Sequence, residues 1–123
     1  MFRSIIVGTD GSETAALAVD RAVELGVASG AKVTIASAGS PARAKQVVEA
    51  EAGRHTEAGV EIRTEVLDGD PVSALLDRAE TGDFDLMVVG NKGMTGASRF
   101  LLGSVPNKIS HHVPIALLIV RTT

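Results

Sequence analysis

The sequence predicts an α/β fold in which one doubly wound sheet of five parallel strands is flanked by helices. Two observations support this prediction. Short strand-like segments alternate regularly with helix-like segments along the chain, an order typical of parallel sheets. Four of the five strand-like segments are continuous apolar runs, as expected of parallel strands that are covered on both faces. A length of 123 residues fits one domain, so residues 1–123 are predicted to form a single domain.

Five segments are predicted to be strands: Ser4–Thr9, Ala31–Gly39, Val60–Val66, Phe84–Gly90 and Val113–Val120. The third differs from the others, because apolar and charged residues alternate along it. One predicted face holds Val60, Ile62, Thr64 and Val66, and the other holds Glu61, Arg63 and Glu65. This pattern indicates a strand with one solvated face, or a strand at the edge of the sheet.

Helical spacing and end signals predict a helix after each of the first four strands. The first helix is capped by Asp10 or Ser12 and has apolar residues at helical spacing. The second covers residues 40–57, where the helical pattern is weak. The third begins after the cap residue Asp70, which is followed by a proline suited to the first helical position. The fourth covers residues 104–112.

The composition disfavours several classes of function. A net charge of −3 disfavours nucleic acid or an anionic membrane as a partner. With three Phe and no Trp or Tyr, the chain can hardly build the aromatic stacking surface of a single-strand nucleic-acid binder. The absence of Cys excludes thiol catalysis and thiolate metal sites. Neither a signal peptide nor an apolar run of about 20 residues is found, so we expect a cytoplasmic location.

The segment 88–108 has the features of an anion-binding loop. Gly90 and Gly93 follow a buried strand, and glycine lets the backbone approach a ligand closely. Successive N–H groups in such a loop can form a concave anion site. Gly103 and Ser104 then open a helix, whose free N–H groups also attract anions. The alternative is that the glycines only form turns, but long loops in compact domains are usually functional.

The spacing Gly90-x2-Gly93-x9-Gly103-Ser104 resembles the nucleotide-binding signature of the universal stress protein family. The N-terminal segment IIVGTDGSE and the segments DLMVVGNKGMTGASRFLLGSV and VPIALLIV are also similar to that family. The resemblance covers essentially the whole chain, although residues 40–57 look shorter than the usual second crossover. It implies a Rossmann-like, HUP-type fold with strand order 3-2-1-4-5. It also implies an ATP-binding regulatory module of the stress response.

The resemblance further implies which residues bind the nucleotide. Gly90 and Gly93 would approach the ribose and the phosphates with their backbone. Gly103 and Ser104 would hold the phosphates, and Ser104 would also use its hydroxyl. The implied ligand is ATP, with or without Mg²⁺. AMP and cyclic AMP are alternatives that would use the same contacts.

Asp10 and Ala38 are implied to meet the adenosine part of the ligand. Asp10 matches the family's acidic residue after the first strand, and Ala38 the place where main chain meets the adenine edge. Lys92 is either a phosphate partner or a solvated loop residue, and Asp10 could serve only as a helix cap. Three sequence neighbours complete the predicted site: Thr9, Asn91 and Val105.

No catalytic or metal-binding residues are predicted. The chain shows no Ser-His-acid set, no carboxylate pair with an evident task and no P-loop motif. His111 and His112 are neighbours, so they point apart on a helix and do not form a metal site. We therefore expect a binding protein, with at most slow ATP hydrolysis.

A phosphoacceptor receiver domain is the alternative from another class. Its fold is also doubly wound, and Asp10 could form half of its acidic pocket. Against this, residue 9 is Thr where a second acidic residue is expected. The fifth predicted strand is also the last element, with no lysine-bearing loop and helix after it.

A homodimer through the fifth strand is expected. With strand order 3-2-1-4-5 this strand lies at an edge of the sheet, yet the run Ile115–Val120 carries no charge. An exposed apolar edge strand would promote aggregation. A second copy of the chain would cover it, as the family resemblance also implies. The alternative is that a helix and the C-terminal residues cover this edge.

Overall fold

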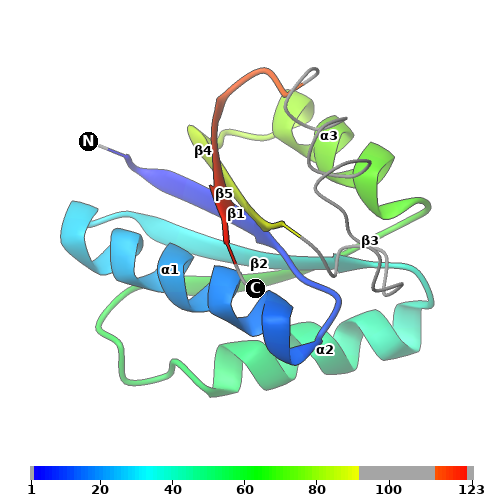
Figure 1. Cartoon of the computed structure of the whole chain (residues 1–123), viewed down its shortest axis with the longest axis horizontal. Coiled ribbons are helices and arrows are strands. Elements are labelled where there is room, and N and C mark those ends of the chain that lie inside the picture. Colours follow the sequence, from blue (N-terminus) through cyan, green and yellow to red (C-terminus); the bar gives the residue numbers. More distant parts are fainter. Residues whose placement is uncertain (1, 92–112, 122–123) are drawn as a thin grey trace.

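The computed structural model describes residues 2–91 and 113–121. Its five strands form one parallel sheet in the order β3-β2-β1-β4-β5 (Figure 1). They are β1 (Ser4–Gly8), β2 (Lys32–Ala38), β3 (Ile62–Leu67), β4 (Leu86–Gly90) and β5 (Ala116–Val120). The predicted fold class and strand order are thus confirmed. No helix within residues 2–91 or 113–121 is long and apolar enough to cross a membrane.

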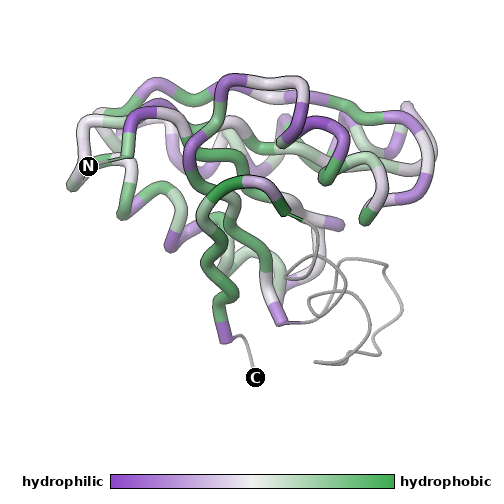
Figure 2. The backbone as a smooth tube through the Cα atoms, turned by 90° about the horizontal axis from the view of Figure 1, so that it is seen from above, coloured by the Kyte–Doolittle hydropathy of each residue, from purple (hydrophilic) through white to green (hydrophobic). Residues whose placement is uncertain are grey.

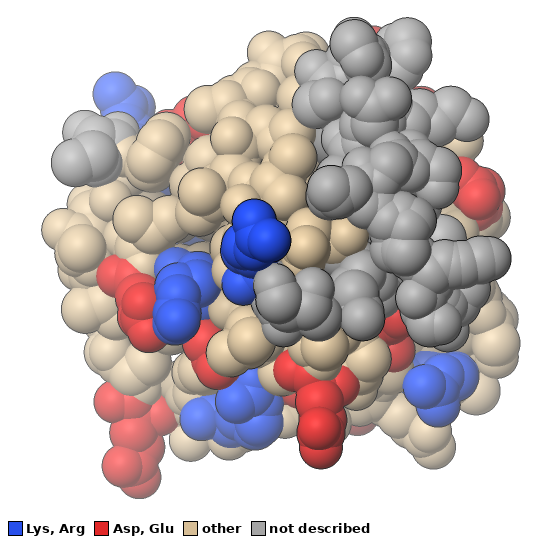
Figure 3. Space-filling model, in the orientation of Figure 1, with Lys and Arg blue, Asp and Glu red and all other residues tan. Residues whose placement is uncertain are grey.

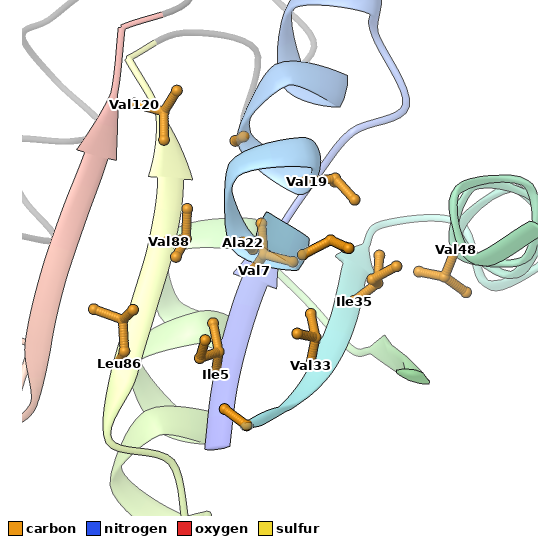
Figure 4. Packing of buried hydrophobic residues seen from close by; sticks show 13 residues of the cluster. Ile5, Val7, Val19, Ala22, Val33, Ile35, Val48, Leu86, Val88 and Val120 are labelled. Carbon is orange, nitrogen blue, oxygen red and sulfur yellow. The ribbon is translucent and has the colours of Figure 1, made fainter. Parts of the chain in front are cut away.

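The helices cover both faces of the sheet. They are α1 (Glu13–Ser29), α2 (Pro41–Gly53) and α3 (Pro71–Thr81). On one face, α1 and α2 pack against alternate strand residues such as Val7, Ile35 and Val88 (Figure 4). On the other face, α3 packs against the intervening residues, including Ile6 and Met87. The two-residue period of the strands therefore divides the apolar residues between two cores.

The centre of the sheet is the most thoroughly buried part of the chain. All residues of β1 and β4 are buried, as the continuous apolar runs predict. Figure 2 shows hydrophobic residues concentrated along the strands. This packing fixes the carboxyl ends of β1 and β4, where the predicted site begins.

The starts of α1 and α3 follow the predicted capping signals. Ser12 caps α1, and its side chain accepts the N–H of Ala15 at 3.1 Å. Asp70 caps α3 and accepts the N–H of Ser73 at 3.1 Å. These contacts satisfy N–H groups that have no partner within the helix.

The weakly patterned second helix is shorter than predicted. It ends at Gly53, and a turn follows in place of the predicted residues 54–57. The third strand begins at Ile62 and ends at Leu67, one to two residues later than predicted. As expected, it lies at an edge of the sheet. The predicted apolar face of this strand is only partly covered: Ile62 is half-buried, but Val66 is 40% exposed. An edge strand has a neighbouring strand on one side only.

Candidate functional site

The predicted site lies where β1 and β4 run side by side. The chain leaves β1 towards β2 on one side, and β4 has β5 as its other neighbour. Such a reversal of strand order is the topological switch point, where ligands bind outside the carboxyl ends of strands in open α/β sheets. Val7 pairs with Val88, so the same register places Thr9 level with Gly90. Asn91 donates its N–H to the carbonyl of Val120 at 3.0 Å, which holds the end of β4 against β5.

Two side chains shape the tight turn between β1 and α1. The Thr9 hydroxyl accepts the N–H of Gly11 at 3.1 Å, and Oδ1 of Asp10 accepts the N–H of Ser12 at 2.9 Å. Gly11 takes a φ of +85°, a conformation that favours glycine. The N–H of Thr9 donates to the carbonyl of Ala36 at 3.0 Å. The turn is therefore anchored to β2, and Asp10 sits at the carboxyl end of the sheet.

A small pocket opens beside this turn, on the α3 side of the sheet. Its lining residues come from the ends of β1, β2 and β3 and from the start of α3: Thr9, Asp10, Ala36, Ser37, Ala38, Leu67, Pro71 and Leu75. Leu67, Pro71 and Leu75 give it apolar walls. The cavity is small, about 20 Å³, so it does not enclose a whole ring. The chemistry of its lining suits one edge of a flat, largely apolar ring with polar groups on that edge.

The structure brings Thr9, Asp10 and Ala38 together around this pocket. Gly90 and Asn91 lie at the end of β4 and do not line it. The other predicted site residues lie outside the described residues: Lys92, Gly93, Gly103, Ser104 and Val105. The adenosine part of the predicted site therefore lies within the described residues, whereas only Gly90 and Asn91 of the phosphate part do.

Several pocket residues were not among the predicted site residues, because the site was predicted only from the ends of the first, second and fourth strands and from the loop after the fourth. Leu67 ends the third strand, and Pro71 and Leu75 belong to the helix that follows it. The signal was present, because this strand and the start of this helix were both predicted. Carboxyl ends of parallel strands meet at one edge of a sheet, so these residues had to lie near the site.

The ionisable groups with shifted pKa values lie away from the pocket. The hydrogen bond that Arg54 donates to the Glu51 carboxylate raises the pKa of Arg54, and those that Arg78 donates to Glu65 raise the pKa of Arg78. Asp85 precedes β4, so it lies at the amino end of the strands, whereas the pocket lies at their carboxyl ends. Partial burial acts to raise its pKa, but the N–H groups of Arg3 and Ser4 outweigh this effect and hold the pKa below its usual value. None of these three lines the pocket.

The geometry of Thr9 argues against a receiver-type acidic pocket. Thr9 is 3% exposed, and its hydroxyl is used within the turn. The position where a receiver needs a second carboxylate thus has a local structural task.

Comparison with known proteins assigns the family. The family model described as "Universal stress protein family" matches residues 1–121. Universal stress protein Rv1636 of Mycobacterium tuberculosis is 34% identical over 144 aligned positions, covering 99% of this chain and 98% of the relative. Because this chain has only 123 residues, that alignment contains gaps. The connection between β2 and α2 consists of Gly39 and Ser40.

Solved structures agree with this assignment. A universal stress protein in complex with cAMP has a TM-score of 0.83 and 32% identity, and the match covers 99% of each chain. Protein MJ0577 matches in fold, with a TM-score of 0.85 and 21% identity over 100% of this chain and 98% of the other. The chain therefore belongs to the universal stress protein family.

Proposed function

We propose that this protein binds an adenine nucleotide at the carboxyl end of its sheet, and that ATP is the ligand favoured by its glycine signature. The observation that carries the proposal is the pocket that brings Asp10 and Ala38 together. These are the two residues expected to meet the adenosine part of the ligand. The similar universal stress protein with bound cAMP supports the same class of ligand.

The physical properties of the pocket favour the base over the phosphates. Its walls are mainly aliphatic, and the nearest ionised side chain is the carboxylate of Asp10. Glu13 adds a second acidic residue in the first turn of α1. Phosphates would be repelled here, whereas the amine or hydroxyl groups of adenosine can donate to a carboxylate. The cavity holds only about 20 Å³, far below the roughly 300–1,000 Å³ of a pocket that holds a whole drug-sized ligand, so this lining would contact one edge of the base.

The phosphates would therefore extend towards the end of β4. Gly90 and Asn91 lie there, one strand away from the turn that carries Asp10. The glycine signature continues from Gly90 to Ser104 in sequence. The number of phosphates decides between ATP as the proposed ligand and AMP or cyclic AMP as alternatives.

We propose a regulatory role in the stress response without catalysis beyond slow ATP hydrolysis. The described lining of the pocket contains one carboxylate and no His, Lys or Arg. That set gives no evident acid–base pair for rapid chemistry. We expect the protein to act in the cytoplasm, without nucleic acid or membrane as a partner. On the face seen in Figure 3, basic and acidic groups are interspersed, which supports this expectation.

A homodimer through β5 belongs to the same proposal. β5 lies at an edge of the sheet, and Ile119 on it is 40% exposed. Figure 2 shows this strand as a nearly continuous hydrophobic run leading towards the C-terminus. A second copy pairing along this edge would remove both its apolar side chains and its open backbone groups from water.

Calorimetry with ATP, ADP, AMP and cyclic AMP, each with and without Mg²⁺, tests the proposed ligand. GTP is the matched control, since it has the same phosphates and another base. Tighter binding of ATP than of AMP and cyclic AMP is the expected result. Tighter binding of cyclic AMP than of ATP would identify cyclic AMP as the ligand in place of ATP. Equal binding of GTP and ATP would contradict recognition of the base, and no binding of any nucleotide would overturn the proposed function.

A further inference from the structure

We propose that α2 holds the nucleotide-binding turn in place through Val47, which makes Val47 a positioning residue for Asp10. The inference rests on the proposed nucleotide binding. Val47 does not line the pocket, and it belongs to the helix whose sequence pattern is weak.

Gly11 of the turn lies next to the side chain of Val47. A Cβ atom at position 11 would lie 2.8 Å from Cγ2 of Val47 and 3.3 Å from Cγ1. Both γ-methyl groups of Val47 therefore lie next to the backbone of the turn, in the space that a side chain at position 11 would need. Gly11 also needs its positive φ of +85°. Position 11 is thus restricted to glycine by backbone conformation and by the neighbouring helix.

Asp10 depends on the turn for its orientation. It is half-buried, and its Oδ1 accepts the N–H of Ser12 at 2.9 Å. Gly11 lies between these two residues and is held from the β1 side by the Thr9 hydroxyl. On the opposite side, Val47 is the neighbour that a side chain at Gly11 would strike. The turn is therefore enclosed between β1 and α2.

α2 is itself attached to the sheet, and the residues after it are attached to α1. Ala44 and Val48 are buried, and Val48 points towards Ile35 of β2 (Figure 4). Beyond the end of α2, Arg54 and His55 both contact Oδ1 of Asp20, at 2.9 and 3.0 Å. Asp20 lies on α1, the helix that begins at the turn. Figure 1 shows α1 and α2 together on one side of the sheet.

These contacts form a closed frame. The turn starts α1, α1 is tied through Asp20 to the residues after α2, and α2 returns through Val47 to the turn. A rigid frame keeps the Asp10 carboxylate oriented before the ligand arrives. Such preorganisation increases affinity by lowering the ordering cost of binding.

Val47→Ala tests the proposal by calorimetry with ATP, well below the melting temperature of each variant. The substitution removes both γ-methyl groups from the turn, and we expect binding about tenfold weaker, within the range of coupling between residues in contact. Val47→Ile keeps both γ-carbons and should bind like the wild type. Val33→Ala is the matched control, because it truncates a fully buried valine of β2 near the amino end of the strand, away from the turn. It should lower the melting temperature with little effect on affinity.

A double-mutant cycle with Asp10→Asn separates a positioning role from general loosening. If Val47 acts through Asp10, Val47→Ala should have almost no further effect on affinity in the Asp10→Asn background. Full additivity of the two substitutions would overturn the proposal, as would wild-type affinity in Val47→Ala. Failure of the wild type to bind any adenine nucleotide would instead count against the proposed function.

Discussion

The carboxylate of Asp10 accepts the N–H of Ser12 at 2.9 Å, so the residue expected to meet the nucleotide also shapes the start of α1. The side chain has two oxygens, and this hydrogen bond uses Oδ1. Asp10 lines the pocket as well. Shaping the turn before α1 and binding a ligand are therefore compatible at this position, and a substitution can separate them.

Asp10→Asn should weaken adenine-nucleotide binding about tenfold and leave the fold intact. Asparagine retains an oxygen for the Ser12 N–H but loses the charge that strengthens a hydrogen bond to the ligand, a difference of about 1.4 kcal/mol. Calorimetry gives the affinity, and thermal unfolding gives the stability. Glu80→Gln removes an exposed charge of α3 that does not line the pocket and serves as the control. Unchanged affinity in Asp10→Asn would leave Asp10 with a structural role in the β1–α1 turn only.

Ala38→Leu should block the pocket. Ala38 is half-buried at the end of β2 and lines the cavity, so a larger side chain there would take the space of the base. Overpacking of this kind costs about 1–3 kcal/mol, which corresponds to a loss of affinity of about five- to 150-fold. Ala42→Leu adds the same volume on the exposed side of α2 and should leave binding unchanged. Equal effects of the two substitutions in a binding titration would argue against this pocket.

The fold of the described residues could be predicted largely from the sequence, and the predicted helix over residues 104–112 lies outside them. Its strongest signals were continuous apolar strands such as β1 and β4, which have to be buried on both faces. The end of α2 was misplaced, because its helical pattern is weak and the sequence has no clear stop signal before Gly53. Strand ends were shifted by one to three residues, since hydrophobicity alone does not fix where backbone pairing stops.

The site was predictable where it depends on local sequence and less so where it depends on packing. Asp10 and Ala38 follow predicted strands, so their meeting at one edge of the sheet could be inferred. The contact of Val47 with Gly11 could not, because it depends on how closely α2 approaches the β1–α1 turn. Nothing in the local pattern of residues 40–57 indicates that distance.

Replacements at Gly103 and Ser104 test the phosphate side of the site, which lies outside the described residues. Gly103→Ala should weaken nucleotide binding with little loss of stability, because a backbone cradle needs glycine for close approach. Ser104→Ala should cost roughly 1–2 kcal/mol, near tenfold, if its hydroxyl binds phosphate. Titration with adenosine as well as ATP supplies the control, since adenosine binding should not change. An unchanged ATP affinity in Gly103→Ala would refute the cradle.

Ile119→Lys should convert the proposed dimer to a monomer. Ile119 is 40% exposed on the edge strand β5, and a buried lysine at a strand-to-strand interface would be unpaired. Sedimentation over a range of concentrations measures the change. Val27→Lys replaces a valine of α1 that is 51% exposed, and it should leave the oligomeric state unchanged. A wild-type protein that sediments as a monomer at all concentrations would remove the basis for this interface.

Asp85→Asn should destabilise the fold at neutral pH and much less in acid. The Asp85 carboxylate accepts the N–H groups of Arg3 and Ser4 at 2.9 and 3.1 Å, tying the start of β4 to the start of β1. Asparagine can accept through one oxygen only, which leaves one N–H poorly satisfied at a cost of about 1–3 kcal/mol.

The pH dependence of this difference follows from the lowered pKa of Asp85 in the folded state. A lowered folded pKa contributes stability above the usual carboxyl pKa of about 3.9. That contribution is lost as the pH falls through the usual value towards the folded one. Urea unfolding of the wild type and Asp85→Asn between pH 7 and pH 3 should therefore give a constant difference down to about pH 5 and a shrinking one below it. A difference that stays constant to pH 3 would mean that the charge of Asp85 does not contribute to folding stability.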